Sequence, residues 1–292
     1  MSDDPAPYAD TLTLLACQIS IPAMTAIAER NAHLTACVAK VDACLKASTR
    51  RVDLVVMPEL SSLDYARDTF ENLAELAEPL DGPSFQAWRR LAQDHEVHVV
   101  YGFARAAQDG PRICSAVVGP QGQLVGYYDK LHLAQYGASM EKDYFTRGEH
   151  LLVFTLKGFR IAPIICYDIR FPDLSRVLVV DHEVDLLLHC GAYYRDESFH
   201  TWHAFATTRA LENQVHLLSL NRAGQSYGNS VFCLPWHDET CRPEVFEGRE
   251  EDFRLITLDQ RTQAKVRERY TFLKDRIRYD ALFNYSDKSG KT

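Results

Sequence analysis

The sequence predicts an α/β fold in one domain, with large β-sheets covered by helices. Apolar, β-branched runs that suit buried strands alternate along the chain with segments whose apolar residues recur at helical spacing. The 292 residues are 46% hydrophobic and 25% charged, which is typical of a globular protein with a full core. No Gly/Ser linker, repeat or break in composition divides the chain, so we expect residues 1–292 to form a single domain.

The first half of the chain is expected to alternate strands with helical segments and then to form a hairpin. Apolar runs predict strands at residues 12–20, 52–57 and 97–103. Helical spacing of apolar residues predicts a helix over 24–47, and further helical segments are expected at 70–78 and 83–94. The runs 113–118 and 124–128 flank the turn-rich segment 119–123, which predicts a hairpin that leads to Lys130. Residues 134–150 are expected to form a loop.

The second half continues the alternation of strands and helices. Strands are expected at residues 151–156, 159–165, 184–189, 215–220, 229–234 and 253–258. Helices are expected over 172–181 and 201–214, and the charged tail 260–280 also has a helical pattern.

Composition excludes several classes of partner. The formal net charge of −8, without a dense basic cluster, argues against a nucleic-acid partner. No apolar stretch is long enough to span a bilayer, and the N-terminus lacks the pattern of a signal peptide. The 8 cysteines form no C-x-x-C pair, which indicates reduced thiols and a cytoplasmic location. His182, His189 and Cys190 do not have the spacing of metal ligands, so no metal is expected.

Cys166 is the first candidate for chemistry. An apolar run leads into it and polar and proline residues follow at once, which predicts a strand, a sharp turn and a helix that opens near Pro172. A strand fixes the position of a thiol, and a nearby helix N-terminus favours its thiolate and any oxyanion beside it. The alternative is a core cysteine, because free cysteines are among the most buried residues.

Glu59 and Lys130 are charged residues at the ends of two other predicted strands. Each could be a solvated strand terminus, but together with Cys166 they form a chemically complete set. A poorly solvated carboxylate has a raised pKa and suits the role of general base toward a thiol. A fixed ammonium group can stabilise the oxyanion of a tetrahedral intermediate, together with the backbone N–H after the nucleophile.

Three segments together carry a family resemblance. Met57-Pro58-Glu59, the run from Tyr128 to Leu133 and the run from Cys166 to Asp173 resemble, in order and spacing, the motifs of the nitrilase (carbon–nitrogen hydrolase) superfamily. Gln18 and the segment 209–213 also match, and the resemblance extends over about residues 12–275. It implies a four-layer α-β-β-α sandwich with a core at about 12–260 and homodimers or larger homo-oligomers. The extension 260–292 is then a candidate for an oligomer interface.

The resemblance also implies a mechanism without metal or organic cofactor. Cys166 would attack a small-molecule amide after passing its proton to Glu59, and Lys130 with the Tyr167 N–H would stabilise the oxyanion. Ammonia or an amine would leave, and Glu59 would activate water against the thioester. Some amidase branches carry a second glutamate in a loop after the lysine, and Glu141 resembles it. A charge on a surface loop is the alternative for this residue.

The substrate is less well specified by the sequence. Tyr65, Tyr193, Tyr194 and Trp202 are candidates to line a pocket, with Tyr167 and Arg170 beside the nucleophile. Relatives that cleave N-carbamoyl-D-amino acids tend to have a second arginine just before the one that Arg170 matches, where this chain has Ile169. Nitrile-hydrolysing relatives usually have tryptophan after the cysteine. We therefore expect an amide substrate, with carbamoyl compounds or nitriles as alternatives.

Three other functions fit the sequence less well. Gly224-Gln225-Ser226-Tyr227-Gly228 fits the G-x-S-x-G elbow of α/β-hydrolases. A predicted strand follows it, however, and no acidic residue lies between Ser226 and the last histidine, His237. An Asp-Lys-Cys hydrolase on a doubly wound sheet would need an aspartate at an early strand end, whereas Asp53 is near a strand start. A catalytically silent binding or scaffold protein is the alternative of a different class, and the intact Glu-Lys-Cys set argues against it.

Overall fold

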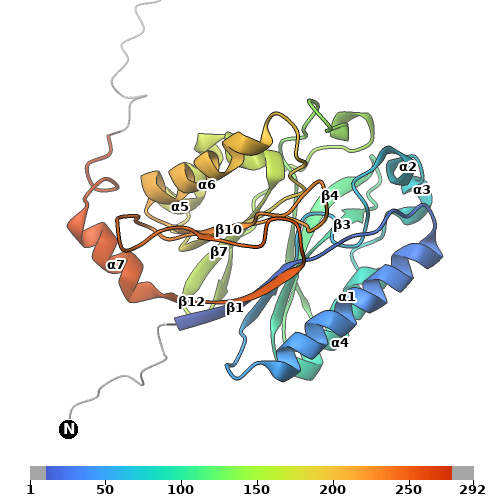
Figure 1. The fold of residues 1–292 in the computed structure, drawn as a ribbon, viewed down its shortest axis with the longest axis horizontal. Helices are drawn as coiled ribbons and strands as arrows, with labels where there is room; N and C mark the ends of the chain where they lie inside the picture. Colours follow the sequence, from blue (N-terminus) through green and yellow to red (C-terminus); the bar gives the residue numbers. More distant parts are fainter. Residues whose placement is uncertain (1–10, 278–292) are drawn as a thin grey trace, which may run out of the picture.

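The computed structural model describes residues 11–277, and within them two six-stranded sheets are stacked between two layers of helices (Figure 1). Helices α1 (Ile27–Ala47) and α4 (Pro83–His95) cover the outer face of the first sheet. Helices α5 (Pro172–Val180) and α6 (Phe199–Asn213) cover the outer face of the second sheet. This confirms the expected α-β-β-α sandwich.

The first sheet has parallel strands at its centre. Its order is β12-β1-β2-β3-β4-β5, and β1, β2 and β3 are parallel neighbours. The remaining neighbours pair antiparallel, and the hairpin of β4 and β5 lies at one edge. The bounds of the strands are β1 Thr11–Gln18, β2 Leu54–Val56, β3 His98–Arg105, β4 Arg112–Val118, β5 Leu124–Asp129 and β12 Asp252–Asp259.

The second sheet has the same organisation. Its order is β11-β10-β9-β8-β7-β6, and β7, β8 and β9 are parallel neighbours. The bounds of the strands are β6 Phe154–Leu156, β7 Phe159–Ile165, β8 Leu186–Cys190, β9 His216–Leu220, β10 Val231–Cys233 and β11 Glu244–Val245. Parallel strands end on one edge of their sheet, so the carboxyl ends of β7, β8 and β9 lie together.

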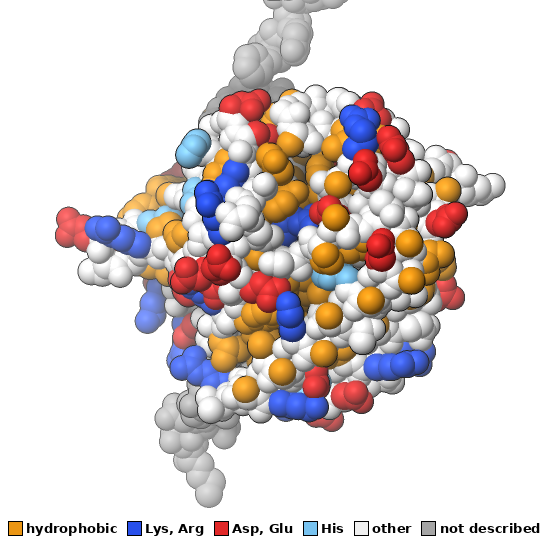
Figure 2. Space-filling model, turned by 45° about the vertical axis from the view of Figure 1, so that its right-hand side comes forward, with side chains coloured by type: hydrophobic (Ala, Val, Ile, Leu, Met, Phe, Trp, Pro, Cys, Tyr) orange, Lys and Arg blue, Asp and Glu red, His pale blue; other side chains and the backbone are white. Residues whose placement is uncertain are grey.

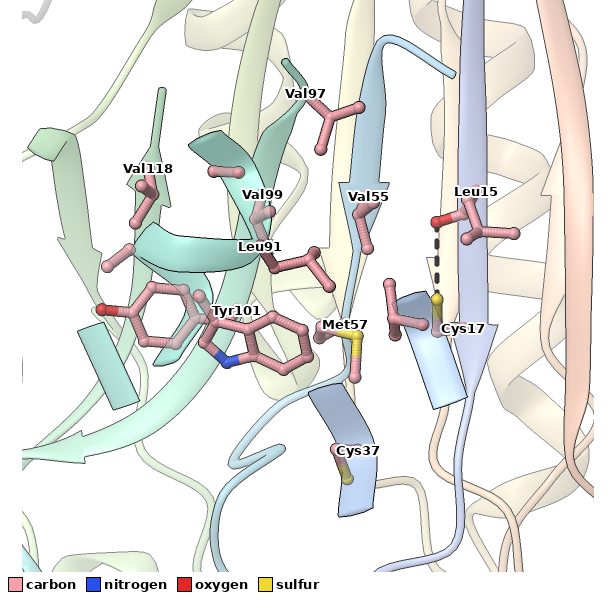
Figure 3. Close-up of a cluster of buried hydrophobic side chains, with 14 of the residues drawn as sticks. Leu15, Cys17, Cys37, Val55, Met57, Leu91, Val97, Val99, Tyr101 and Val118 are labelled. Carbon is pink, nitrogen blue, oxygen red and sulfur yellow. Dashed lines mark hydrogen bonds between the residues drawn. The ribbon is translucent and has the colours of Figure 1, made fainter. Parts of the chain in front are cut away.

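Three apolar layers hold the sandwich together. The layer under α1 and α4 contains Val55, Met57 and Cys17, which lie near one another in Figure 3. A second layer fills the space between the two sheets, and it includes Leu14 and Leu188. The third layer packs α5 and α6 on the second sheet. Strands buried on both faces explain why their sequences are continuous apolar runs without alternation.

Most predicted elements are present, with differences at their ends. The helical segment expected at 70–78 is replaced by two short helices, α2 (Arg67–Phe70), which ends where that segment begins, and α3 (Leu73–Leu76). The expected loop 134–150 contains a single 3₁₀ turn, η1 (Glu141–Asp143). The helix predicted over 260–280 was too long. Helix α7 (Gln260–Arg269) ends where Tyr270 becomes extended and stacks on Trp236, and 278–280 lie outside the described residues.

The surface is mixed in charge where it can be seen. On the face shown in Figure 2, acidic and basic side chains are interspersed. Among residues 11–277, no helix is long and apolar enough to cross a bilayer. The 8 cysteines all fall in this range, and all are free thiols.

Candidate active site

Cys166 lies at the predicted junction of strand, turn and helix. It follows β7 directly and begins the 3₁₀ turn η2 (Cys166–Arg170), after which α5 starts at Pro172. The Cys166 backbone has φ of 46°, in the left-handed region that an L-residue other than glycine rarely adopts. The thiol is half-buried. The neighbouring residues must therefore hold a strained backbone at this position.

Asp168 anchors this turn to the segment that carries Lys130. Its Oδ2 accepts hydrogen bonds from Ile165 N at 2.9 Å and from the Tyr128 hydroxyl at 2.7 Å. Its Oδ1 accepts from His132 N at 3.0 Å and lies 2.7 Å from His132 Nδ1. A fully buried carboxylate with four hydrogen-bond contacts to three residues joins the ends of β7 and β5. Asp168 is not among the residues predicted for the site, although an acidic residue two positions after the candidate nucleophile is a visible signal in the sequence.

Glu59 is held in place by a close approach of two backbones. It follows β2 in the loop from Pro58 to Ser62, which lies against β3 at Gly102. A Cβ at Gly102 would be 2.5 Å from Pro58 O and 2.6 Å from Leu60 N, so only glycine fits there. The Ser61 hydroxyl also donates to Gly102 O at 2.9 Å. The position of Glu59 is thus fixed by the sheet.

Lys130 joins two buried carboxylates. Its Nζ donates to Glu59 Oε1 at 2.8 Å and to Glu141 Oε1 at 2.6 Å, and all three side chains are 0% exposed. Glu141 also accepts from the Tyr65 hydroxyl at 2.8 Å and, through Oε2, from Ala134 N at 2.8 Å. Glu141 is therefore buried together with Lys130 and Glu59 and is not a charge on the surface.

The second sheet completes the surroundings of Glu59. The Ala192 N–H, just beyond the end of β8, donates to Glu59 Oε2 at 2.8 Å. Ala192 and Cys166 pack in the same apolar cluster at this end of the sandwich. The site thus combines Glu59 and Lys130 from strand ends of the first sheet with Cys166 and a backbone donor from strand ends of the second.

The electrostatics of the three groups are coupled. Burial raises the pKa of Glu59, the Lys130 ammonium lowers it and the Glu141 charge raises it, with a net value of about 7. Burial alone would lower the pKa of Lys130, but Glu141 and Glu59 raise it well above its usual value. Burial and the Glu59 charge raise the pKa of the Cys166 thiol, against the opposing effect of Lys130. At neutral pH the thiol is protonated and the ammonium is charged, so the thiol needs a base.

The other predicted site residues take different positions. Tyr65 is buried and contacts Glu141, and Tyr194 is 41% exposed with its ring against Tyr227. Tyr193 is buried and stacks on Trp202 at 4.6 Å between ring centroids. Trp202 is 1% exposed, so it lies behind Tyr193 in the core and not on an open wall.

Tyr167 and Arg170 follow Cys166 on the turn η2 and are half-buried. The Arg170 guanidinium lies over the rings of Tyr136 and Phe205, at 5.5 and 4.9 Å from their centroids. Its Nε and Nη2 atoms are buried and have no hydrogen-bond partner among the described residues. Cys166 and Arg170 both influence the pKa of Tyr136, so the three groups are close. Two guanidinium nitrogen atoms on the turn that follows the nucleophile are therefore buried without an acceptor among the described residues.

Gln18 and Arg209, which match the superfamily outside its three main motifs, support the fold around the site. Gln18 donates to Glu247 O and Glu250 O and accepts from Ser230, which ties β1 to the segments around β10 and β12. Arg209 on α6 donates to Ile169 O at 3.0 Å and so supports the turn η2. In the described part of the chain, no group of three or more His, Cys, Asp or Glu side chains could hold a metal ion.

Comparisons with known proteins agree with this fold. The family model for carbon–nitrogen hydrolase matches residues 14–247. The 2-oxoglutaramate amidase of Bacillus subtilis (strain 168) is 29% identical over 236 residues, 78% of this chain and 86% of that protein. An (R)-stereoselective amidase of Pseudomonas sp. is 30% identical over 228 residues, 77% of this chain and 79% of that protein. The crystal structure of a CN-hydrolase superfamily protein from Xanthomonas campestris aligns with a TM-score of 0.76 and 23% identity, over 92% of this chain and 98% of that one.

The fold and the family match together define a hydrolase of the α-β-β-α sandwich class. The chain belongs to the carbon–nitrogen hydrolase family, as the three sequence motifs predicted. It is an enzyme of that family, and the amidases among its relatives support action on amides.

Proposed function

We propose that this enzyme cleaves the C–N bond of a small non-peptide amide through a thioester on Cys166. The observation that carries the proposal is the buried cluster in which Lys130 Nζ contacts both Glu59 and Glu141, near the Cys166 thiol, whose pKa is raised by burial. A charged set of this kind is costly to bury and has a ready chemical use in acyl transfer.

The acylation step follows from the charges. Glu59 takes the thiol proton, the Cys166 sulfur forms a bond to the amide carbon, and the carbonyl π electrons move to oxygen. Lys130 and the Tyr167 N–H stabilise this oxyanion. When the oxyanion collapses, the C–N bond breaks and the proton on Glu59 passes to the leaving nitrogen, which departs as ammonia or an amine.

The deacylation step uses the same base. Glu59 removes a proton from water, the water oxygen attacks the thioester carbon, and the C–S bond breaks. The acid product leaves and the proton returns to the sulfur. Glu59 suits both directions because its pKa of about 7 lets it hold or release a proton near neutral pH.

Glu141 has a different role in this proposal. Its oxygens already accept from Lys130, Tyr65 and Ala134, so it is less free than Glu59 to take a proton from the thiol. We assign Glu141 to holding the Lys130 ammonium in place and to raising the pKa of Glu59. Glu141 then acts through its neighbours and not on the substrate.

Arg170 favours a substrate that carries a carboxylate as well as the amide. Two of its nitrogen atoms are buried without a partner, and such donors are costly unless a ligand binds them. The relative from Bacillus subtilis is named for 2-oxoglutaramate, which has both groups. Carbamoyl compounds and nitriles remain the alternative substrates for the same three catalytic residues.

Ammonia release from a defined panel tests the proposal. The panel contains propionamide, 2-oxoglutaramate, an N-carbamoyl amino acid and propionitrile, with Cys166→Ala as the control. We expect release from the amides, the fastest from 2-oxoglutaramate, and none with the control. In Arg170→Met the KM for 2-oxoglutaramate should rise more than the KM for propionamide. Release that survives Cys166→Ala, or silence on every compound, contradicts the proposal.

Three further expectations from the sequence stay predictions. A homodimer or larger homo-oligomer is checked by light scattering on the full chain. A cytoplasmic location is checked by cell fractionation, and cooperative unfolding in a single calorimetric transition would support one domain.

A further inference from the structure

The layer between the second sheet and its helices contains a polar chain that the proposed mechanism does not use. His189 on β8 and Ser219 on β9 occupy paired positions of two parallel strands, and both are fully buried. Their neighbours on the same face, such as Leu187 and Leu217, belong to the apolar layer under α5 and α6. A buried polar pair in such a layer requires hydrogen-bond partners.

The partners form one continuous chain. Trp202 Nε1 donates to Ser219 Oγ at 2.7 Å, and Ser219 Oγ lies 2.6 Å from His189 Nδ1. His189 Nε2 lies 2.9 Å from the Cys166 carbonyl oxygen. The Tyr193 hydroxyl donates to the same oxygen at 2.9 Å. The chain therefore ends on the backbone of the proposed nucleophile.

The chemistry of the two ends fixes the direction of every bond. An indole nitrogen only donates and a carbonyl oxygen only accepts, so His189 carries its proton on Nε2 and accepts at Nδ1. The Ser219 hydroxyl must then donate to Nδ1 while it accepts from Trp202. Burial lowers the pKa of His189 to about 4, so its ring is neutral near pH 7 and this arrangement is maintained.

We propose that His189 and Tyr193 are positioning residues that aim the oxyanion donor of the active site. They hold the Cys166 carbonyl oxygen from the buried side. That oxygen belongs to the same planar peptide unit as the Tyr167 N–H, in which C=O and N–H point in opposite directions. Fixing the oxygen therefore directs the N–H away from the buried side.

The two donors have a second effect on the same peptide unit. Hydrogen bonds to a carbonyl oxygen polarise the peptide and strengthen its N–H as a donor. They also help to hold the Cys166 backbone at φ of 46°. This inference rests on the proposed function, because the Tyr167 N–H is the oxyanion donor only if the thiol attacks a carbonyl group.

The test measures oxyanion stabilisation without turnover. Propionaldehyde is the probe: the Cys166 sulfur adds to its carbonyl carbon, the carbonyl oxygen becomes the oxyanion, and the thiol proton passes to Glu59 or to that oxygen. Bound aldehyde protects the thiol from iodoacetamide, and mass spectrometry of the peptide containing Cys166 gives the concentration for half-protection.

The variants are matched in pairs. Tyr193→Phe removes one donor to the Cys166 oxygen, and Tyr101→Phe removes a buried hydroxyl in another layer that has no partner among the described residues. His189→Met removes the other donor, whereas His189→Gln places an amide N–H near the position of Nε2. If His189→Met does not fold, Tyr193→Phe still carries the test.

In Tyr193→Phe and His189→Met, the aldehyde concentration for half-protection should be about 10-fold or more above that of the wild type. The loss of one oxyanion donor lowers the rate by about 10²–10³, and in these variants the Tyr167 N–H is misaligned but not removed. Tyr101→Phe should match the wild type, and His189→Gln should lie within about 3-fold of it. For amide hydrolysis, kcat should fall in the first two variants while KM stays within about 2-fold.

The outcomes separate this inference from the proposed function. Unchanged half-protection in Tyr193→Phe, or an equal loss in Tyr101→Phe, would overturn the inference and leave the proposed amide hydrolysis standing. The expected pattern of protection, in an enzyme that hydrolyses none of the panel compounds, would support the inference and reject the proposed reaction. A wild-type thiol that propionaldehyde does not protect would overturn the inference.

Discussion

Replacing Glu141 with Gln should move the pH dependence of catalysis, because it removes a negative charge next to the proposed base. Lys130 Nζ lies 2.8 Å from Glu59 Oε1 and 2.6 Å from Glu141 Oε1, so the two oxygens are at most about 5.4 Å apart. Two unit charges at that separation repel by about 3 kcal/mol at an effective dielectric constant of about 20. The negative charge of Glu141 contributes to the raised pKa of Glu59.

The expected shift follows from this repulsion. The wild-type kcat/KM should rise with pH and reach half of its plateau near pH 7, as Glu59 loses its proton. In Glu141→Gln the same rise should occur about 1–2 pH units lower, since 3 kcal/mol corresponds to about 2 units and each charge is spread over two oxygens. The plateau should also fall, because a Gln amide cannot accept from Lys130, Tyr65 and Ala134 at once.

A control variant must show that removing a negative charge elsewhere on the same turn does not shift the pH profile. Asp143→Asn removes an exposed charge from the same turn as Glu141, where the Asp143 carboxylate accepts a hydrogen bond from Gln135. The rate of alkylation of Cys166 by iodoacetamide should follow the same pH profile as kcat/KM. An unshifted profile in Glu141→Gln, or an equal shift in Asp143→Asn, would refute the reasoning.

Three further variants test stability together with the site. Lys130→Met leaves two buried carboxylates without their cation, so urea denaturation at neutral pH should show a free energy of unfolding lower by about 3–5 kcal/mol. A decrease of less than about 1 kcal/mol would contradict both ion pairs. Gly102→Ala forces a Cβ against Pro58 O and Leu60 N, so the free energy of unfolding should fall by about 1–3 kcal/mol and kcat should also fall. Wild-type kinetics in this variant would refute the close approach of the two backbones. Cys166→Gly should be about 1 kcal/mol more stable than Cys166→Ala, because glycine adopts positive φ without strain, and equal melting temperatures would argue against that strain.

The sequence predicted those features that depend on local pattern. Continuous apolar runs correctly indicated the buried strands. The two charged residues at strand ends, Glu59 and Lys130, contact each other, and Cys166 begins a turn at the end of a third strand. Short elements were harder to place, since α2 and α3 are held by tertiary packing of Phe70 and Leu73 and have little helical periodicity of their own.

The polar contacts around the site could not be predicted in this way. His189 was considered only as a metal ligand, yet it contacts Ser219 and the Cys166 carbonyl, and this pairing depends on the register of β8 and β9. Trp202 was expected to line a pocket, but it donates to Ser219 from within the core. The sequence shows that His189 and Trp202 can form hydrogen bonds, but the fold determines which partners they contact.

The proposed base and the proposed nucleophile stand on different sheets, and the layer between those sheets consists mainly of apolar side chains. The thickness and alignment of that layer therefore set the distance between the Glu59 carboxylate and the Cys166 sulfur. Truncating Leu14 or Leu188, both distant in sequence from the reacting groups, would let one sheet slide on the other. Turnover in such a protein should decline at temperatures where circular dichroism still reports intact secondary structure, which makes catalysis a sensitive reporter of how the two halves are aligned.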